Sequence, residues 1–164
     1  MNVFIDASNL WAAQKTKGKL FDLAKLQSFL KQAHSATDIN TFYYDAYPAP
    51  GTRDYDIEGK FRFYVYLEKN LGFVVRKKAL KQIKIMSDKG HKIQEKGNMD
   101  VELSIDFVDN IYAYQEAILF TGDSDFLALI SYARKKNKRV HVYSSRNNVS
   151  FELRTGADSY SDVL

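Results

Sequence analysis

The chain has 164 residues, 45% apolar and 27% charged, a balance that excludes extensive disorder and predicts one domain over residues 1–164. It has no Cys, which excludes disulfides and thiolate metal sites, and His34, His91 and His141 show no ligand spacing, so we expect oxygen ligands for any metal. With no signal-like N-terminus and no apolar run of membrane-spanning length, we expect a cytoplasmic protein without membrane contact.

The first half of the chain alternates apolar strands with amphipathic helices. Hydrophobic periodicity predicts a strand, two helices, a strand, a helix and a strand over residues 2–5, 10–17, 21–33, 39–47, 56–71 and 73–75. Residues 80–86 and 91–95 then alternate Ile with Lys around a turn, which is typical of a two-stranded hairpin with one wet face. The alternation up to this hairpin is typical of a parallel α/β arrangement.

The second half continues the alternation. It predicts a helix, a strand, a helix, a strand and a helix over residues 99–112, 117–120, 126–137, 138–143 and 149–154. We expect Asn98 to cap the first of these helices. Its buried face is expected to carry Val101, Ile105, Val108 and Tyr112, widened by Leu103 and Phe107. The fold class is therefore α/β: a three-layer α/β/α sandwich with a central, mainly parallel sheet, plus a basic β-hairpin around residues 80–95.

The net charge of +4 is concentrated in residues 76–96, where eight cations meet two acids. A patch of this kind suits a polyanion, because each cation that meets a phosphate releases counterions. A solvated hairpin that only adds solubility is the commoner explanation of such a run. The expected phosphate contacts are Arg76, Lys77, Lys78, Lys81, Lys84, Lys92 and Lys96.

Four Asp side chains fall where predicted strands end or a helix begins. Asp6 follows the first strand, and Asp100 lies in the first turn of the helix after the hairpin. Asp123 and Asp125 follow the strand over residues 117–120. Ligands bind at this edge of open α/β sheets, and acids that converge there favour Mg²⁺ or Mn²⁺ as the neutralising ion.

The same residues can also be read as ordinary helix caps, since Asp and Ser are common at helix starts. We expect Ser124 to cap the helix after the corner while Asp123 and Asp125 face the ion. Asn9 could add an amide oxygen to the cluster, or serve only as a turn residue.

Three motifs occur in order along the chain, at residues 4–9, 96–106 and 121–129. Together they resemble the NYN domain, in the LabA-like (DUF88) branch of the PIN-like nucleases. Residues 150–153 and 157–158 also resemble the C-terminal helix and the final acidic position of that family. The long basic hairpin before the second motif has no clear match in the family pattern.

The resemblance implies a PIN-like sandwich and metal-dependent cleavage of RNA, which we expect to be single-stranded. It implies that the catalytic and metal-holding residues are Asp6, Asp100, Asp123 and Asp125, with Asn9 and Ser124 beside them. Asp106 matches a recurrent acid, but six residues along a helix is a turn of about 600°, so it faces away from Asp100 and is expected to be structural. Glu102 is expected on a solvated face. A homodimer is left open.

Two other functions remain open at this point. Residues 122–125 resemble the late acidic motif of haloacid-dehalogenase phosphohydrolases, but that chemistry needs a second Asp two residues after the first, and Ser8 follows Asp6 at that spacing. A PIN-like fold can also be kept as a non-catalytic RNA-binding or regulatory module.

Overall fold

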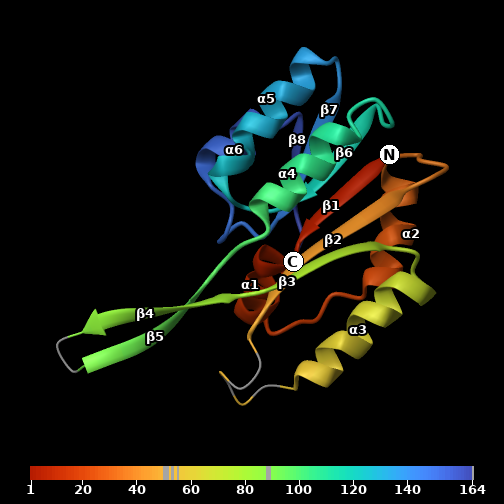
Figure 1. Cartoon of the computed structure of the whole chain (residues 1–164). Helices are drawn as coiled ribbons and strands as arrows, with labels where there is room; N and C mark the ends of the chain where they lie inside the picture. The colour runs from red at the N-terminus through yellow and green to blue at the C-terminus, as the bar shows by residue number, and fades with distance from the viewer. Residues whose placement is uncertain (50–51, 53, 55, 88–89, 164) are drawn as a thin grey trace.

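The computed structural model describes residues 1–49, 52, 54, 56–87 and 90–163, and for residues 87 and 90–92 only the backbone is described. Strands and helices alternate along it (Figure 1). In chain order they are β1 (Asn2–Asp6), α1 (Ala7–Lys17), α2 (Leu23–Ala33), β2 (Asn40–Tyr47), α3 (Ile57–Asn70), β3 (Val74–Ala79), β4 (Lys81–Ser87), β5 (Gly90–Lys96), α4 (Asp100–Asp109), β6 (Glu116–Phe120), the short 3-10 turn η1 (Ser124–Phe126), α5 (Leu127–Lys135), β7 (Arg139–Ser144), α6 (Phe151–Gly156) and β8 (Ser159–Asp162).

The central sheet has the strand order β3-β2-β1-β6-β7-β8, and each of its neighbouring pairs is parallel. The chain builds outward from β1 to β3 on one side, then returns to the other side of β1 and builds outward from β6 to β8. The winding direction therefore changes between β1 and β6. The carboxyl ends of strands at such a switch point are where open α/β sheets bind ligands.

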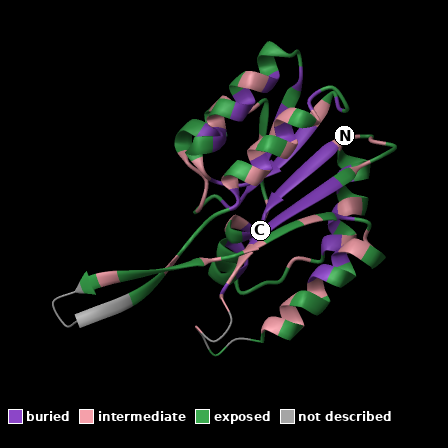
Figure 2. Cartoon of the chain, viewed as in Figure 1, coloured by how far each residue is buried: buried purple, intermediate pink, exposed green. Residues whose placement is uncertain are grey.

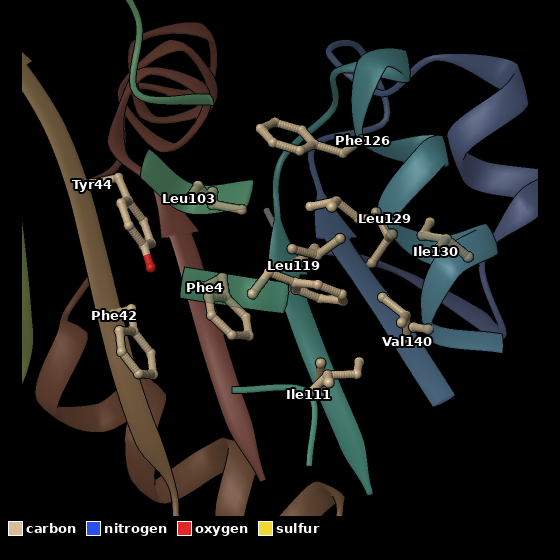
Figure 3. Close-up of a cluster of buried hydrophobic side chains, with 14 of the residues drawn as sticks. Phe4, Phe42, Tyr44, Leu103, Ile111, Leu119, Phe126, Leu129, Ile130 and Val140 are labelled. Carbon is tan, nitrogen blue, oxygen red and sulfur yellow. The ribbon is translucent and has the colours of Figure 1, made fainter. Parts of the chain in front are cut away.

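Helices cover both faces of the sheet: α1, α2 and α3 lie on one face, and α4, α5 and α6 on the other (Figure 1). Every residue of β1 is buried, because its side chains alternate between two cores (Figure 2). Val3 and Ile5 pack against the first helix layer. Phe4 lies in the other core with Phe42 and Leu119 (Figure 3), and its ring packs against that of Phe107 of α4. The predicted three-layer sandwich with a parallel sheet is confirmed.

The buried face of α4 differs from the predicted one. Leu103 and Phe107 are fully buried, whereas Val101, Ile105 and Tyr112 are 64%, 54% and 78% exposed. The helix carries two apolar stripes, and the stripe with the larger aromatic side chain packs against the sheet, where the rings of Phe107 and Phe4 are 5.1 Å apart.

The start of α4 was also predicted wrongly. Met99 is the N-cap residue and makes no side-chain cap hydrogen bond, while the Asn98 side chain donates a hydrogen bond to the Asp100 carboxylate. Asn98 therefore serves Asp100 rather than the backbone of the helix.

The predicted hairpin is present as the antiparallel pair β4 and β5, which projects away from the sheet (Figure 1). The expectation of one wet face is wrong, because Ile83 and Ile93 are exposed and most described side chains of the hairpin face solvent (Figure 2). The short polar strand β8 was not predicted. Among the helices that the structure describes, none has the length and apolar character needed to cross a membrane.

Candidate functional site

Asp6 is both the last residue of β1 and the N-cap of α1. Its Oδ1 accepts hydrogen bonds from the backbone N–H of Ser8 (3.0 Å) and from the Ser8 hydroxyl (2.7 Å). Its Oδ2 accepts a hydrogen bond from the Asn9 side-chain amide (3.0 Å). The cap needs only one carboxylate oxygen. The other oxygen, Oδ2, points toward Thr121 at the end of β6.

Asn9 and Thr121 connect the ends of β1 and β6. The Asn9 Nδ2 group donates to the Thr121 hydroxyl (3.1 Å), and Asn9 Oδ1 accepts from the Gly122 backbone N–H (2.8 Å). The Thr121 hydroxyl in turn lies 3.3 Å from Asp6 Oδ2. These hydrogen bonds fix the distance between the ends of β1 and β6, and Asn9 makes the connection from a position beside Asp6. Sequence reasoning did not single out Thr121, because a Thr at a strand end carries no signal of its own.

Asp123, Ser124 and Asp125 form the corner that follows β6. Asp123 caps η1, since its Oδ1 accepts a hydrogen bond from the Asp125 backbone N–H (2.9 Å). The expectation that Ser124 caps this helix is therefore wrong: the carboxylate at the preceding position takes the cap. Phe126 anchors the corner by pointing into the core under α4 and α5 (Figure 3).

Gly122 brings the corner close to the loop before α6. A Cβ atom at this position would lie 2.0 Å from the backbone carbonyl oxygen of Asn148, so no side chain fits. The Gly122 carbonyl also accepts a hydrogen bond from the Ser150 N–H (2.9 Å). The glycine therefore allows a close backbone approach that holds the Asp123 corner in place.

Asp100 begins α4 and is half-buried. Burial is the largest cause that raises the pKa of its carboxyl group to about 6. The next causes are the negative charges of Asp6, Asp123 and Asp125. Asp6 ends β1, Asp100 begins α4, and Asp123 and Asp125 follow β6, so the four acids lie at this end of the sheet and the other three act electrostatically on Asp100. Among the described residues, they do not bring three carboxylate oxygens within 4.8 Å of one another.

A pocket of about 420 Å³ adjoins Asp6 at the carboxyl ends of β1 and β2. Its lining includes Asp6, Trp11, Asp45 and Lys60. Asp45 is buried, and its Oδ2 contacts the Lys60 ammonium (2.7 Å) and the Tyr64 hydroxyl (3.0 Å). Burial raises the pKa of Asp45, and Lys60 opposes that rise. Sequence reasoning missed this pair, although a carboxylate inside an aromatic strand was a usable signal.

Asp106 lies in a separate network. It accepts a hydrogen bond from the Tyr44 hydroxyl (3.0 Å) and two from the Arg76 guanidinium (2.9 and 3.2 Å). These contacts tie Asp106 of α4 to β2 and β3, and its role beside the site stays a prediction. The same contacts mean that Arg76 has a carboxylate partner within the protein.

The remaining predicted phosphate contacts divide into two groups. In β3, Lys78 contacts Glu102 (2.6 Å) and Lys77 lies 4.0 Å from Glu68, so these cations have carboxylate partners like Arg76. Glu102 is therefore not on a solvated face as expected, and its Oε2 atom is buried without a hydrogen-bond partner among the described residues.

On the hairpin, Lys81, Lys84 and Lys96 are exposed, while the side chain of Lys92 lies outside the described part of the chain. Lys81 and Lys96 stand directly opposite each other in the β4–β5 register. Like charges in this position repel, so an anion would stabilise this end of the hairpin. Leu80 and Gly97, the residues next to this pair, line the pocket beside Asp6.

Two of the histidines, His34 and His141, lie side by side, although their spacing in the sequence gave no sign of this. The rings of His34 and His141 have centroids 4.7 Å apart, and both residues contact Glu116. Nitrogen as well as oxygen atoms therefore lie close together at the amino ends of the strands, opposite the end that holds Asp6, and the expectation of oxygen ligands for any metal stays a prediction.

The chain is similar to known proteins over nearly its whole length. The NYN domain family matches residues 1–164. The chain is 30% identical over 161 residues to the low amplitude and bright protein LabA of Synechococcus elongatus, which covers 98% of this chain and 82% of LabA. It is also similar to the crystal structure of a Vibrio parahaemolyticus protein of unknown function, with a TM-score of 0.72, 21% identity, and coverage of 99% of this chain and 91% of that one. At that identity the second likeness shows the fold alone.

Proposed function

The chain belongs to the NYN domain family, whose fold is related to that of the PIN-like nucleases, and from this premise we propose that it is a metal-dependent ribonuclease acting on single-stranded RNA. The proposal is supported best by the positions of Asp6, Asp100, Asp123 and Asp125 at the switch point of the sheet, where burial and then the charges of the other three acids raise the pKa of Asp100.

The donor set fits a hard divalent cation. Asp6, Asp100, Asp123 and Asp125 offer carboxylate oxygens, which Mg²⁺ and Mn²⁺ prefer. Lys78 lowers the pKa of Asp100, but its ammonium group is paired with Glu102, so the like charges at this edge still favour a cation. When bound, such an ion lowers the pKa of a coordinated water and stabilises the charge that develops on a phosphodiester.

The protein's own groups hold this site in shape before any ligand arrives. Ser8 and Asn9 orient the Asp6 carboxylate, and Thr121 fixes its distance from the end of β6. Preorganisation of this kind lowers the cost of reaching the reactive arrangement. Asn9 therefore acts as a positioning residue rather than a reacting group.

The hairpin supplies a path for the RNA backbone. Lys81 and Lys96 form a cationic pair at the end of the hairpin that joins the pocket beside Asp6. A phosphate between them would relieve their repulsion and place the neighbouring nucleotides at the acidic edge. The exposed ring of Trp11 lines the same pocket and offers a surface on which a base can stack.

The direct test is cleavage of a labelled single-stranded RNA by metal-stripped protein, with and without Mn²⁺. We expect cleavage only with the metal, and a loss of at least about a hundredfold in rate in Asp123→Asn, in which the amide can still cap η1. Asp109→Asn, the same change at the far end of α4, should keep the wild-type rate. Equal cleavage by Asp123→Asn would refute the assignment, and RNA binding without cleavage by the wild type would leave a binding module as the function.

A further inference from the structure

The amino ends of β6 and β7 hold a cluster of side chains that the proposed ribonuclease chemistry does not use. One potential ligand atom from each of His34, Glu116 and His141 lies within 4.8 Å of those of the other two. Their side chains are 12%, 23% and 13% exposed, so the cluster is mostly enclosed but open to solvent.

The fold brings these residues together from three elements. Glu116 begins β6 and His141 lies in β7, and both side chains are on the face of the sheet that α2 covers. On this face, Glu116 is followed in β6 by Ile118 and Phe120, which alternate with residues that face the other core. His34 is the C-cap residue of α2, which covers that face. The cluster therefore ties the end of α2 to the start of two central strands.

The nitrogen atoms that face the carboxylate are defined by the contacts. His141 Nε2 is 3.2 Å and His34 Nδ1 is 3.9 Å from the same atom, Glu116 Oε2. The other carboxylate oxygen, Oε1, is paired with Arg139. In a tetrahedral site with bonds of about 2.0–2.1 Å, ligand atoms are roughly 3.3 Å apart, so a small rotation of His34 would complete the set.

The second nitrogen of each ring is also bound. His34 Nε2 lies 2.9 Å from the Tyr143 hydroxyl, and His141 Nδ1 lies 2.7 Å from the Ser159 hydroxyl. Hydrogen bonds of this kind orient metal-bound imidazoles and fix their tautomers. A plain His–Glu ion pair needs neither hydroxyl, whereas a metal site is expected to have both.

We propose that His34, Glu116 and His141 form a second metal site, which binds Zn²⁺ with its fourth position open to water. Two imidazoles and one carboxylate suit Zn²⁺ and disfavour Mg²⁺, so the ion differs in class from the one expected at the acidic edge. Glu116 and Phe120 are separated by the length of β6, roughly 13 Å, so the two sites are independent. The Zn²⁺ site does not rest on the proposed ribonuclease function.

The test uses the full chain without a histidine tag, stripped of metal and titrated with Zn²⁺ in excess Mg²⁺ so that the acidic edge is occupied. Calorimetry should show one Zn²⁺ per chain, and a hundredfold excess over Kd should raise Tm by about 5–10 °C. His34→Ala and His141→Ala should each weaken Zn²⁺ binding at least about tenfold and lose most of the rise in Tm. Ser159→Ala should weaken binding by about tenfold, because it removes only the orienting hydroxyl.

Two controls separate this site from the rest of the chain. His91→Ala, at the third histidine, and Asp123→Asn should bind Zn²⁺ as the wild type does. If either His variant fails to fold by circular dichroism, Glu116→Gln replaces it, and Co²⁺ absorption in the visible range reports the coordination directly. A wild type that binds no Zn²⁺, or binding that survives the substitutions at His34 and His141, would overturn the proposal.

Discussion

Asp6 is the last residue of β1 and caps α1, whereas Asp123 follows β6 and caps η1, so both carboxylates lie at the carboxyl ends of the strands. At Asp123 capping and metal binding are compatible, because the cap hydrogen bond uses Oδ1. At Asp6 both oxygens accept hydrogen bonds, Oδ1 from Ser8 and Oδ2 from Asn9 and Thr121, so an amide there would set one donor against another. Asn keeps most of the capping strength of Asp but removes the charge, so Asp123→Asn separates the electrostatic role from the structural one, which Ala would not do.

Asp100 makes the protein without metal sensitive to pH. Its folded pKa of about 6 is above the ordinary value of 3.8, so this group makes the folded state lose stability as pH rises from about 4 to 6. We expect Asp100→Asn to stabilise the metal-free protein at pH 8 by roughly 1 kcal/mol, after allowance for its partial exposure, or about 2–4 °C in Tm.

At pH 4.5 the gain should be much smaller. Thermal unfolding at the two pH values measures the difference, with Asp109→Asn as the matched control that should change Tm equally at both. A gain from Asp100→Asn that is the same at both pH values would show that repulsion among the four acids is not its cause.

Gly122 lies where two backbone segments approach closely. Ala here would place Cβ against the Asn148 carbonyl oxygen (2.0 Å) and close to Asn9 Oδ1 (3.0 Å), so backbone must move. We expect Gly122→Ala to destabilise the protein by about 1–3 kcal/mol, measured by urea unfolding. Gly156→Ala should cost less, because its Cβ would meet only the end of the Leu127 side chain. Equal stability of the two variants would contradict the close approach at Gly122.

Among the elements, β1, β2 and β6 were predictable because each contains an apolar or aromatic run that is buried on both faces, and β7 because Val140 and Val142 alternate with polar residues. The face of α4 was not, since periodicity cannot choose between two apolar stripes when the choice depends on contact with Phe4 across the core. The strand β8 was missed because three of its four residues, Ser159, Ser161 and Asp162, are polar and give no apolar run, so its pairing with β7 leaves no signal in the sequence.

Some residues of the candidate site were likewise predictable from the sequence, and others were not. Chain position predicted that the acids would follow strand ends, so Asp6 and Asp123 could be named from the sequence. The contact of Thr121 with Asp6 needs β1 and β6 to be neighbours, the Asp45–Lys60 pair needs α3 to pack against β2, and the His34–Glu116–His141 cluster needs α2 to cover β6 and β7. Strand order and helix packing are tertiary properties that a single sequence does not carry.

The hairpin gives a prediction at this scale. Lys81→Gln with Lys84→Gln should weaken binding of single-stranded RNA and reduce the slope of log K against log salt by about 1.4, since each phosphate contact contributes about 0.7. Lys15→Gln with Lys17→Gln, at the exposed end of α1, is the matched control and should leave the slope unchanged. An unchanged slope in the hairpin variant, measured by fluorescence anisotropy, would remove the hairpin from the RNA-binding surface.

Over the whole molecule, the parallel sheet has different metal-ligand groups at the carboxyl ends and at the amino ends of its strands. The carboxyl ends of β1 and β6 meet four carboxylates, and the start of β6 meets two imidazoles and one carboxylate. Parallel strands make this separation possible, because all their carboxyl ends point the same way. A hard ion and a borderline ion are therefore expected to distribute between the two ends of the strands without competing.

Mn²⁺ binding to metal-stripped protein, followed by electron paramagnetic resonance of the free ion, tests whether Asp6, Asp100, Asp123 and Asp125 form a metal site. The acidic cluster predicts saturable Mn²⁺ binding that Asp123→Asn weakens at least about tenfold, and that Asp109→Asn and His34→Ala leave unchanged. Mn²⁺ binding of the same strength in Asp123→Asn, or none in the wild type, would contradict the claim that these carboxylates form a metal site.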